Sequence, residues 1–334
     1  MKVLVTGALG YIGSHTCVKL LLAGHEVLAV DDLSNSSLEV LDAIKSITQN
    51  DITFYQLNCA QLNFVDFFID NQIQFDAIIH FAAFKSTNES LLDPNAYYEN
   101  NIMSIINLMK LFKSSGFKKF VFSSSCIVYG DDIVSPVTEE SASKRNLTPY
   151  GNSKRIGEEL LEDYAGLFNL GTISLRYFNP IGAHSSGDIG ERPKGVPANL
   201  LPYICEVAAG KRSSLNIFGN DYNTSDGTAI RDFIHVEDLA CAHIAALDYT
   251  LPQDEWYDVF NIGTGKGYTV LEVVEKFEEV NNISIPYNLV DRRPGDIEKI
   301  YADTKKAEEK LNWRAKLELN EMLKSAWVFQ QKNT

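Results

Sequence analysis

The sequence is poor in cysteine and histidine, and this scarcity argues against two kinds of site. Among 334 residues there are six histidines and five cysteines, namely Cys17, Cys59, Cys126, Cys205 and Cys241. The cysteines are odd in number, scattered and never spaced as Cys-x-x-Cys, so the pattern predicts neither a disulfide framework nor a zinc site. We therefore expect single thiols in a reducing, cytoplasmic environment and no bound metal.

Basic residues and long apolar runs are also few. Lysine and arginine together number 30 against 44 aspartates and glutamates, which gives a net charge of −14. A chain this acidic is not expected to bind nucleic acid or an anionic membrane surface. No apolar run reaches the roughly 18 residues of a membrane span. The first predicted strand begins at residue 2, so we expect no signal peptide.

The residues that are present predict an α/β fold. The chain is 45% hydrophobic and 22% charged, a balance typical of an ordered globular protein. Short β-branched runs alternate with amphipathic stretches, which predicts parallel strands joined by crossover helices. The expected architecture is a doubly wound parallel sheet of the Rossmann type. Its predicted strands are 2–7, 26–32, 52–58, 76–83, 118–125 and 172–179.

The alternation ends after Asn179, which predicts a second, smaller α/β domain that binds the substrate. Residues 180–197 are rich in glycine and proline, as is typical of a loop. A later segment, about 233–265, has the pattern of a strand, a helix and a second strand that return to the first domain. We therefore expect a first domain of residues 1–179 with this returning segment, and a second domain of residues 180–232 and 266–334.

A glycine loop follows the first predicted strand. Gly7, Gly10 and Gly13 are three residues apart and open a helical stretch, whose N-terminal amides can hold a pyrophosphate. The alternative is a tight turn without a ligand, but a strand before the loop and a helix after it favour a dinucleotide. Asp31, at the end of the second strand, can accept hydrogen bonds from the adenosine ribose and repel a 2′-phosphate. It can also act as a turn residue. The pattern favours NAD over NADP.

A possible catalytic set lies at the end of the fifth predicted strand and on the following helix. Tyr150 and Lys154 are four residues apart, so they share one helix face. The pKa of a free tyrosine is about 10, and a nearby ammonium favours the phenolate. Ser125 ends its strand at the sheet edge where such folds bind ligands. A tyrosine and a lysine at this spacing also occur on ordinary helix surfaces, but the preceding glycine loop and serine favour catalysis.

Longer motifs carry a family resemblance. They are SSSCIVYG (123–130), YGNSK (150–154), RYFNPIGAHSSGDIGE (176–191), FGNDYNTSDGTAIRDFIHVEDL (218–239) and RRPGD (292–296). Together with the glycine loop, they resemble the UDP-glucose (UDP-galactose) 4-epimerases of the extended short-chain dehydrogenase/reductase superfamily, from residue 1 to about 328. The resemblance implies reversible, NAD-dependent inversion at C4 of UDP-galactose and UDP-glucose through a 4-keto intermediate. It also implies Ser125, Tyr150 and Lys154 as the catalytic residues.

The resemblance assigns further residues to two ligands and predicts a homodimer. Helices at about 95–115 and 149–168 are expected at the dimer seam. The residues expected to contact NAD are Gly7, Gly10, Tyr11, Ile12, Gly13, Asp31, Asn35, Ser36, Asn58, Cys59, Phe81, Ala82, Lys85, Asn100, Ser125, Tyr150, Lys154 and Phe178. The residues expected to contact the UDP-hexose substrate are Asn179, Asn199, Leu200, Asn216, Phe218, Arg231, Arg293, Asp296 and Ile300. The arginines also suit a diphosphate, because their planar cationic groups can bind it through two hydrogen bonds.

Three positions depart from the family pattern. Asn58 and Cys59 stand where an aspartate and an aliphatic residue are usual near the adenine, and Ala83 replaces a glycine. We expect these changes to be tolerated with some loss of cofactor affinity. In the family that this chain resembles, a residue shortly after the RRPGD motif faces the C2 group of the sugar, and a bulky tyrosine there excludes N-acetyl groups. Counting four residues on from Asp296, the resemblance implies Ile300 at this position. UDP-N-acetylglucosamine is therefore expected as an additional or alternative substrate, although a shift of one residue would put Tyr301 there instead.

Two other functions stay open at this point. A nucleotide-sugar 4,6-dehydratase needs an acid–base pair directly after the active-site hydroxyl residue, where this chain has Cys126 and Ile127. A non-catalytic NAD-binding regulator typically lacks the tyrosine or the lysine, and this chain has both. The residues therefore favour the epimerase over either alternative.

Overall fold

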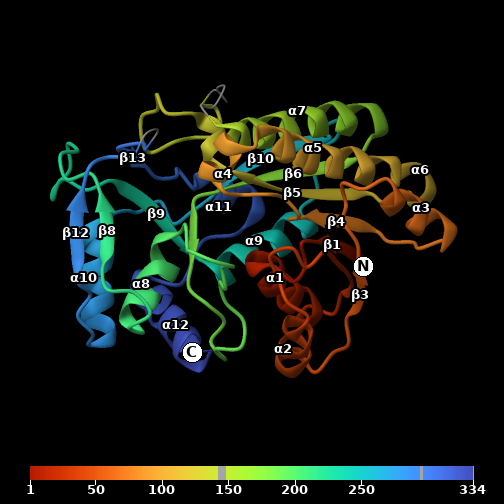
Figure 1. Cartoon of the computed structure of the whole chain (residues 1–334). Coiled ribbons are helices and arrows are strands. Elements are labelled where there is room, and N and C mark those ends of the chain that lie inside the picture. Colours follow the sequence, from red (N-terminus) through yellow and green to blue (C-terminus); the bar gives the residue numbers. More distant parts are fainter. Residues whose placement is uncertain (142–147, 294–295, 334) are drawn as a thin grey trace.

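A seven-stranded parallel sheet forms the centre of the computed structural model, which describes residues 1–141, 148–293 and 296–333 (Figure 1). The strand order is β10-β6-β5-β4-β1-β2-β3, so the chain builds outward from β1 in both directions. This order confirms the predicted doubly wound sheet. Its strands are β1 (Lys2–Thr6), β2 (Glu26–Asp31), β3 (Thr53–Gln56), β4 (Ala77–His80), β5 (Lys119–Ser125), β6 (Gly171–Tyr177) and β10 (Tyr257–Ile262).

Helices cover both faces of this sheet, which explains why its strands are apolar throughout. Alternate residues point to opposite faces: Val3 and Val5 belong to one core cluster and Leu4 to the other. The first face packs against α1 (Tyr11–Leu22), α2 (Glu39–Thr48), α9 (Val236–Asp248) and α11 (Lys305–Leu311). The second packs against α3 (Asn63–Asp70), α5 (Pro94–Lys110), α6 (Phe112–Ser115) and α7 (Pro149–Phe168), with the short α4 (Thr87–Leu92) before α5.

A smaller body lies beside the carboxyl edge of the main sheet (Figure 1). One of its sheets joins β7 (Asn179–Ile181), β9 (Ile230–His235), β11 (Gly267–Thr269) and β13 (Lys299–Ile300), and the other joins β8 (Leu215–Phe218) and β12 (Tyr287–Val290). Its core also takes in α8 (Leu200–Ala208), α10 (Val270–Asn281) and α12 (Leu319–Lys332). Within the described ranges, none of the helices combines the length and apolar character of a membrane span.

The chain crosses between the two bodies several times. The segment expected to return to the main sheet divides: α9 and β10 belong to the main body, whereas β9 pairs with β7, β11 and β13. Neighbouring β9 residues face different cores, because Phe233 packs in the smaller body and Ile234 in the main one. The strand pattern could not reveal this pairing, since a buried strand looks the same in either sheet. The exact domain boundaries stay a prediction.

Candidate active site

The glycine loop lies between β1 and α1 and leaves the start of α1 open. Gly10 is the N-cap residue and makes no side-chain cap, so the first helical amides remain available to an anion. Gly7 has φ +66°, a conformation that favours glycine. A Cβ atom on Gly13 would lie 2.1 Å from the Gly7 carbonyl oxygen, so no other residue fits there. The predicted pyrophosphate cradle is therefore consistent with the backbone that the structure shows.

The loop after β4 closes the other side of this cradle. A Cβ atom on Gly7 would lie 2.8 Å from the backbone nitrogen of Ala82, so the two loops pass in close contact. Phe81 packs into the main core with its ring 4.7 Å from that of His243. The expected cofactor residues Gly7, Phe81 and Ala82 are thus brought together at the carboxyl ends of β1 and β4, the sheet edge where such folds bind ligands.

Asp31 ends β2 with its carboxylate facing the glycine loop. Oδ2 accepts from the Leu9 amide at 3.0 Å. Oδ1 accepts from the Leu33 amide at 2.9 Å and from the Ser36 hydroxyl at 2.6 Å. A carboxylate oxygen can accept two hydrogen bonds, so Oδ2 keeps the capacity to bind a ribose hydroxyl. Asn35, also expected at this edge, has an exposed side chain.

Asn58 and Cys59 follow β3, and the Asn58 side chain binds Asp32, the residue after Asp31. The Asn58 amide donates to Asp32 Oδ2 at 2.8 Å and its oxygen accepts from the Ala60 amide at 2.8 Å. Cys59 is buried, and burial raises the pKa of its thiol. The amide thus orients Asp32, a role that a carboxylate could not fill because it has no hydrogen to donate.

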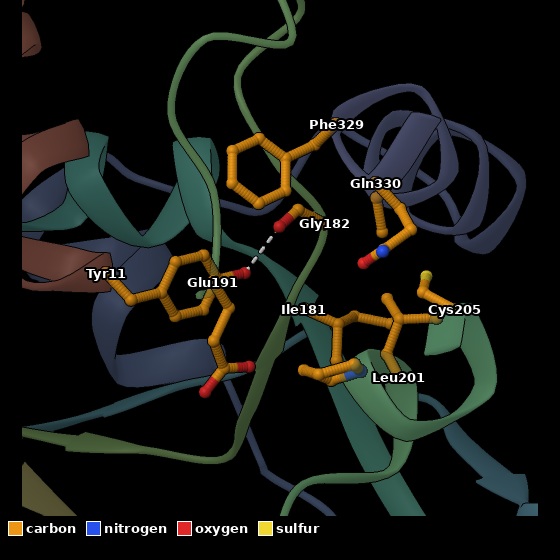
Figure 2. Close-up of a pocket in the computed structure, with 10 residues that line it drawn as sticks. Tyr11, Ile181, Gly182, Glu191, Leu201, Cys205, Phe329 and Gln330 are labelled. Carbon is orange, nitrogen blue, oxygen red and sulfur yellow. Dashed lines mark hydrogen bonds between the residues drawn. The ribbon is translucent and has the colours of Figure 1, made fainter. Parts of the chain in front are cut away.

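Tyr11 connects the start of α1 to the chain that follows β7. Its hydroxyl donates to the Gly182 carbonyl oxygen at 2.6 Å (Figure 2). Burial, with the nearby Glu191 carboxylate, raises its pKa. A cavity of about 20 Å³ adjoins these residues and is also lined by Cys205 and Phe329. That volume is enough for about one water molecule.

The expected catalytic residues meet at the carboxyl end of β5. Ser125 ends the strand, and its hydroxyl accepts from the Ile127 amide at 3.3 Å. Tyr150 lies in the first turn of α7, which begins with Pro149 after an N-cap of Thr148, a usual helix start. Burial raises the pKa of Tyr150 to about 12, and a hydrogen bond with the Ser125 hydroxyl opposes this rise. The serine and the tyrosine are therefore positioned to hold one substrate hydroxyl between them.

Lys154 lies one helical turn after Tyr150 along α7. Its ammonium donates to the Ser123 carbonyl oxygen at 2.7 Å and lies 5.0 Å from the centre of the Phe122 ring. Burial lowers the pKa of Lys154 to about 8, and the Glu158 carboxylate opposes this shift. The lysine is thus held on the sheet while its neighbouring carboxylate favours the charged form. Its influence on the pKa of Tyr150 stays a prediction.

The sequence patterns do not reveal the buried ion pair that anchors α7. Arg176 on β6 binds Glu158 through Nε–Oε1 at 2.9 Å and Nη2–Oε2 at 2.7 Å, and both side chains are 7% exposed. The Ser124 hydroxyl donates to Glu158 Oε1 at 2.5 Å. The spacing in the sequence could have pointed to Glu158 as part of the site, because Glu158 follows Lys154 by four residues and shares its helix face.

Two arginines and an aspartate gather on the substrate side. Arg293 binds Asp296 through Nε–Oδ2 at 2.9 Å and lies 4.7 Å from the centre of the Phe218 ring. Arg231 on β9 is half-buried, and desolvation lowers the pKa of its guanidinium while Asp296 and Cys126 oppose this shift. The charge of Arg231 therefore acts on both Asp296 and Cys126, the residue that follows Ser125.

Ile300, on the short strand β13, packs into a buried cluster next to Cys126. It is 3% exposed and belongs to a cluster with Phe178 and Tyr129, against which Cys126 also packs. The next residue points elsewhere, since a Cβ atom on Gly267 would lie 3.2 Å from the Tyr301 ring.

The remaining residues expected at the two ligands have other partners in the structure. Asn100 donates to Asn101 Oδ1 at 3.1 Å, and Asn216 on the exposed side of β8 accepts weakly from Asn288 at 3.4 Å. Asn179 begins β7 opposite Phe233 of β9. Lys85 and Asn199 both bind Glu191, a residue that the sequence patterns do not single out. Ile12 and Leu200 are partly buried in the two cores.

Three features lie at one edge of the doubly wound sheet. They are an open helix start on a glycine loop, an acidic residue that ends β2, and a serine, a tyrosine and a lysine. Together they are typical of dinucleotide-dependent enzymes that use a tyrosine as the base. Comparison with known proteins narrows the class. Residues 3–263 match the model of the NAD dependent epimerase/dehydratase family, and the chain belongs to this family.

Three similar proteins within the family are named as 4-epimerases of UDP-sugars. The UDP-glucose 4-epimerase of Bacillus subtilis (strain 168) is 48% identical over 100% of this chain and 98% of its own length. The crystal structure of UDP-glucose 4-epimerase from Bifidobacterium longum in complex with NAD⁺ and UDP is 42% identical, with a TM-score of 0.95, over 100% of this chain and 99% of that one. The UDP-Glc/GlcNAc 4-epimerase of Campylobacter jejuni is 36% identical, with a TM-score of 0.84, over 99% of both chains.

Replacing Tyr150 with phenylalanine should lower kcat while leaving the fold and the bound cofactor in place. Only the hydroxyl that faces Ser125 is lost, and groups of this kind typically contribute about 10²- to 10⁴-fold to the rate. Steady-state kinetics would give the loss, with thermal unfolding and cofactor content as controls. Full turnover by this variant would show that Tyr150 is not the base.

Replacing Lys154 with methionine should change the pH dependence of kcat. The pKa of Lys154 is about 8, so its ammonium is present below pH 8 and is lost above it. The variant should therefore fall furthest behind the parent below pH 8, and the gap should narrow at higher pH, where the tyrosine also ionises more readily. Profiles of both proteins from pH 6 to 10 would test this. A constant ratio across that range would contradict the electrostatic role.

Proposed function

We propose that the protein catalyses the reversible, NAD-dependent 4-epimerisation of UDP-galactose and UDP-glucose. The observation that carries this proposal is the meeting of Ser125 and Tyr150 at the carboxyl end of β5, with Lys154 held one helical turn below. The glycine loop at the end of β1 lies two strands away along the same edge. A proton acceptor and a dinucleotide cradle at one sheet edge are what oxidation of a secondary alcohol requires.

The side chains supply the proton chemistry of this reaction. When bound, NAD would supply the hydride acceptor for C4 of the hexose and the hydride donor that restores the alcohol from the opposite face. Tyr150 takes the proton of the 4-hydroxyl as the ketone forms, and gives it back when the alcohol is restored. Ser125 holds the reacting oxygen against the tyrosine. Lys154, kept charged by Glu158, favours the phenolate form of Tyr150 while the base is needed.

Inversion requires that the nucleotide stays bound while the sugar turns. Arg231 and Arg293 are the cations that suit a diphosphate, and the exposed Phe218 ring offers a stacking surface for the base. The pocket near Ser125 is lined by Cys126, Phe178 and Ile300, which are poor partners for sugar hydroxyls. Strong anchoring at the nucleotide and weak anchoring at the sugar allow the 4-ketose to present either face.

The lyase alternative lacks a proton donor in the required place. Burial raises the pKa of Cys126 to about 12, so the thiol stays neutral, and Ile127 has no titratable group. Glu139 is engaged elsewhere, because its Oε1 accepts from the Asn261 amide at 2.7 Å. A 4,6-dehydratase is therefore disfavoured.

We infer a cytoplasmic homodimer in which α5 and α7 meet their counterparts. The two helices lie side by side on the outer layer of the main body (Figure 1). The five cysteines are odd in number and scattered along the chain, which supports a reducing compartment.

Incubating the purified protein with UDP-galactose and following the sugar by proton NMR would test the activity. We expect UDP-glucose to accumulate to equilibrium without added cofactor, because the cycle regenerates NAD. A 4-keto-6-deoxy sugar would instead identify a lyase, and an unchanged spectrum with bound NAD would identify a regulator.

We propose that N-acetylated UDP-hexoses are also accepted. Ile300 lies in the cluster with Phe178 and beside Cys126, whereas Tyr301 packs near Gly267. This supports Ile300, and not Tyr301, as the residue facing the C2 group. An isoleucine leaves more space than a tyrosine, so an acetamido group meets less of a clash.

Replacing Ile300 with tyrosine should shift the substrate preference. Overpacking typically costs about 1–3 kcal/mol, which corresponds to roughly a 5- to 150-fold loss of kcat/KM for UDP-N-acetylglucosamine. UDP-galactose should be little affected. Ile300→Leu preserves the volume and serves as the matched control, with thermal unfolding to confirm the fold. If Ile300→Tyr leaves the ratio of the two kcat/KM values unchanged, Ile300 does not face the C2 group.

A further inference from the structure

The chain between β7 and α8 crosses from the smaller body to the main one. We call residues 182–199 the strap. Lys194 donates to the carbonyl oxygens of Leu33 and Ser34 at 2.9 and 2.8 Å, and Arg192 pairs with Glu39 at 3.2 Å. In Figure 1 the strap is the green chain that descends between α8 and α1. It therefore passes over the edge where the adenosine end of NAD is expected, next to Ser36.

Glu191 on the strap binds one residue from each ligand site. Its Oε1 accepts from Lys85 Nζ at 3.0 Å and from Asn199 Nδ2 at 2.6 Å. Lys85 follows β4 and is expected at the cofactor, whereas Asn199 caps α8 and is expected at the UDP-sugar. The Glu191 side chain is 10% exposed, while that of Lys85 is 53% exposed and Asn199 lies at the surface. A mostly buried carboxylate thus holds two donors that remain open to ligands.

Sharing one oxygen makes these two contacts interdependent. A buried carboxylate must keep hydrogen-bond partners, because an unpaired one carries a large desolvation cost. If a diphosphate draws the Asn199 amide away, Glu191 keeps only Lys85, and the strap is then held to the main body more strongly. The side chain has room to adjust, because the small cavity beside Tyr11 lies against it (Figure 2).

We propose that Glu191 is a positioning residue that couples the two ligand sites, so that a bound uridine diphosphate slows the release of NAD. Occupation of the substrate site releases Asn199 from Glu191 and strengthens the contact between the strap and Lys85. Since coupling free energies are reciprocal, NAD tightens the binding of uridine diphosphate by the same factor. The proposal rests on the proposed function for the identity of the two ligands.

The test measures NAD release, which needs no turnover. Holoenzyme is diluted into buffer with or without saturating UDP, and the NAD released over time is separated by filtration and quantified. In the parent, UDP should slow release by roughly 5-fold or more, the usual lower range of such coupling. In Glu191→Gln, which keeps the bond to Asn199 but loses the ion pair with Lys85, the ratio of the NAD release rate without UDP to the rate with UDP should fall toward one.

Two further variants keep the result interpretable. Lys85→Met removes the other partner of the ion pair and should also bring the ratio of release rates toward one. Because the Lys85 side chain is exposed, this variant remains informative even if Glu191→Gln folds poorly. Glu39→Gln breaks another strap contact that involves no expected ligand residue, and should keep the parent ratio. An unchanged ratio in Glu191→Gln, or its loss in Glu39→Gln, would overturn the assignment. A parent without bound NAD, or one that fails to bind UDP, would instead count against the proposed function.

Discussion

The ion pair between Glu158 and Arg176 fixes the geometry on which the candidate active site depends. Tyr150, Lys154 and Glu158 follow one another at intervals of four along α7, so an anchor at Glu158 sets the rotation of the helix about its axis. Arg176 holds that anchor on β6, and Ser124 holds it on β5, one residue before Ser125. Removing one partner of a buried pair typically costs about 3–5 kcal/mol, so the helix has little freedom to turn. The arginine itself lies 4.7 Å from the centre of the Tyr129 ring, whose hydroxyl donates to Asn261 on β10. The helix α7 is thereby linked to the three neighbouring strands β5, β6 and β10.

The features that sequence could predict are those set by short-range patterns. Gly7, Gly10 and Gly13 lie in the short loop after β1 and the first turn of α1, and Tyr150 and Lys154 are about one helical turn apart, so their spacing already encodes their geometry. The apolar runs of β1 and β5 predicted buried parallel strands because both faces of the sheet are covered. Each of these inferences uses residues close in the chain, where backbone dihedrals restrict the possible arrangements.

The features that sequence could not predict depend on partners far along the chain. Glu191 lies 106 residues from Lys85, and Glu158 is separated from Arg176 by a loop and most of two elements. The pairing of β9 with the smaller sheet and the orientation of Ile300 in the two-residue β13 were equally hidden, because such short strands carry no periodic signal. The role of Asn58 also became clear only from its bond to Asp32, since an amide in a loop has many possible partners.

The interleaved path of the chain has a consequence for how the protein is made. The edge strand β10 comprises residues 257–262 and pairs with β6, more than 80 residues earlier in the chain. A ribosome delivers the N-terminal part first, so the main sheet cannot be completed until β7, α8, β8 and β9 of the smaller body have also been synthesised. Until then β6 presents an unpaired edge, which is prone to associate with other chains. Neither body is a unit that can be cut out and expressed alone, and a truncation before residue 262 would leave the nascent sheet open to aggregation.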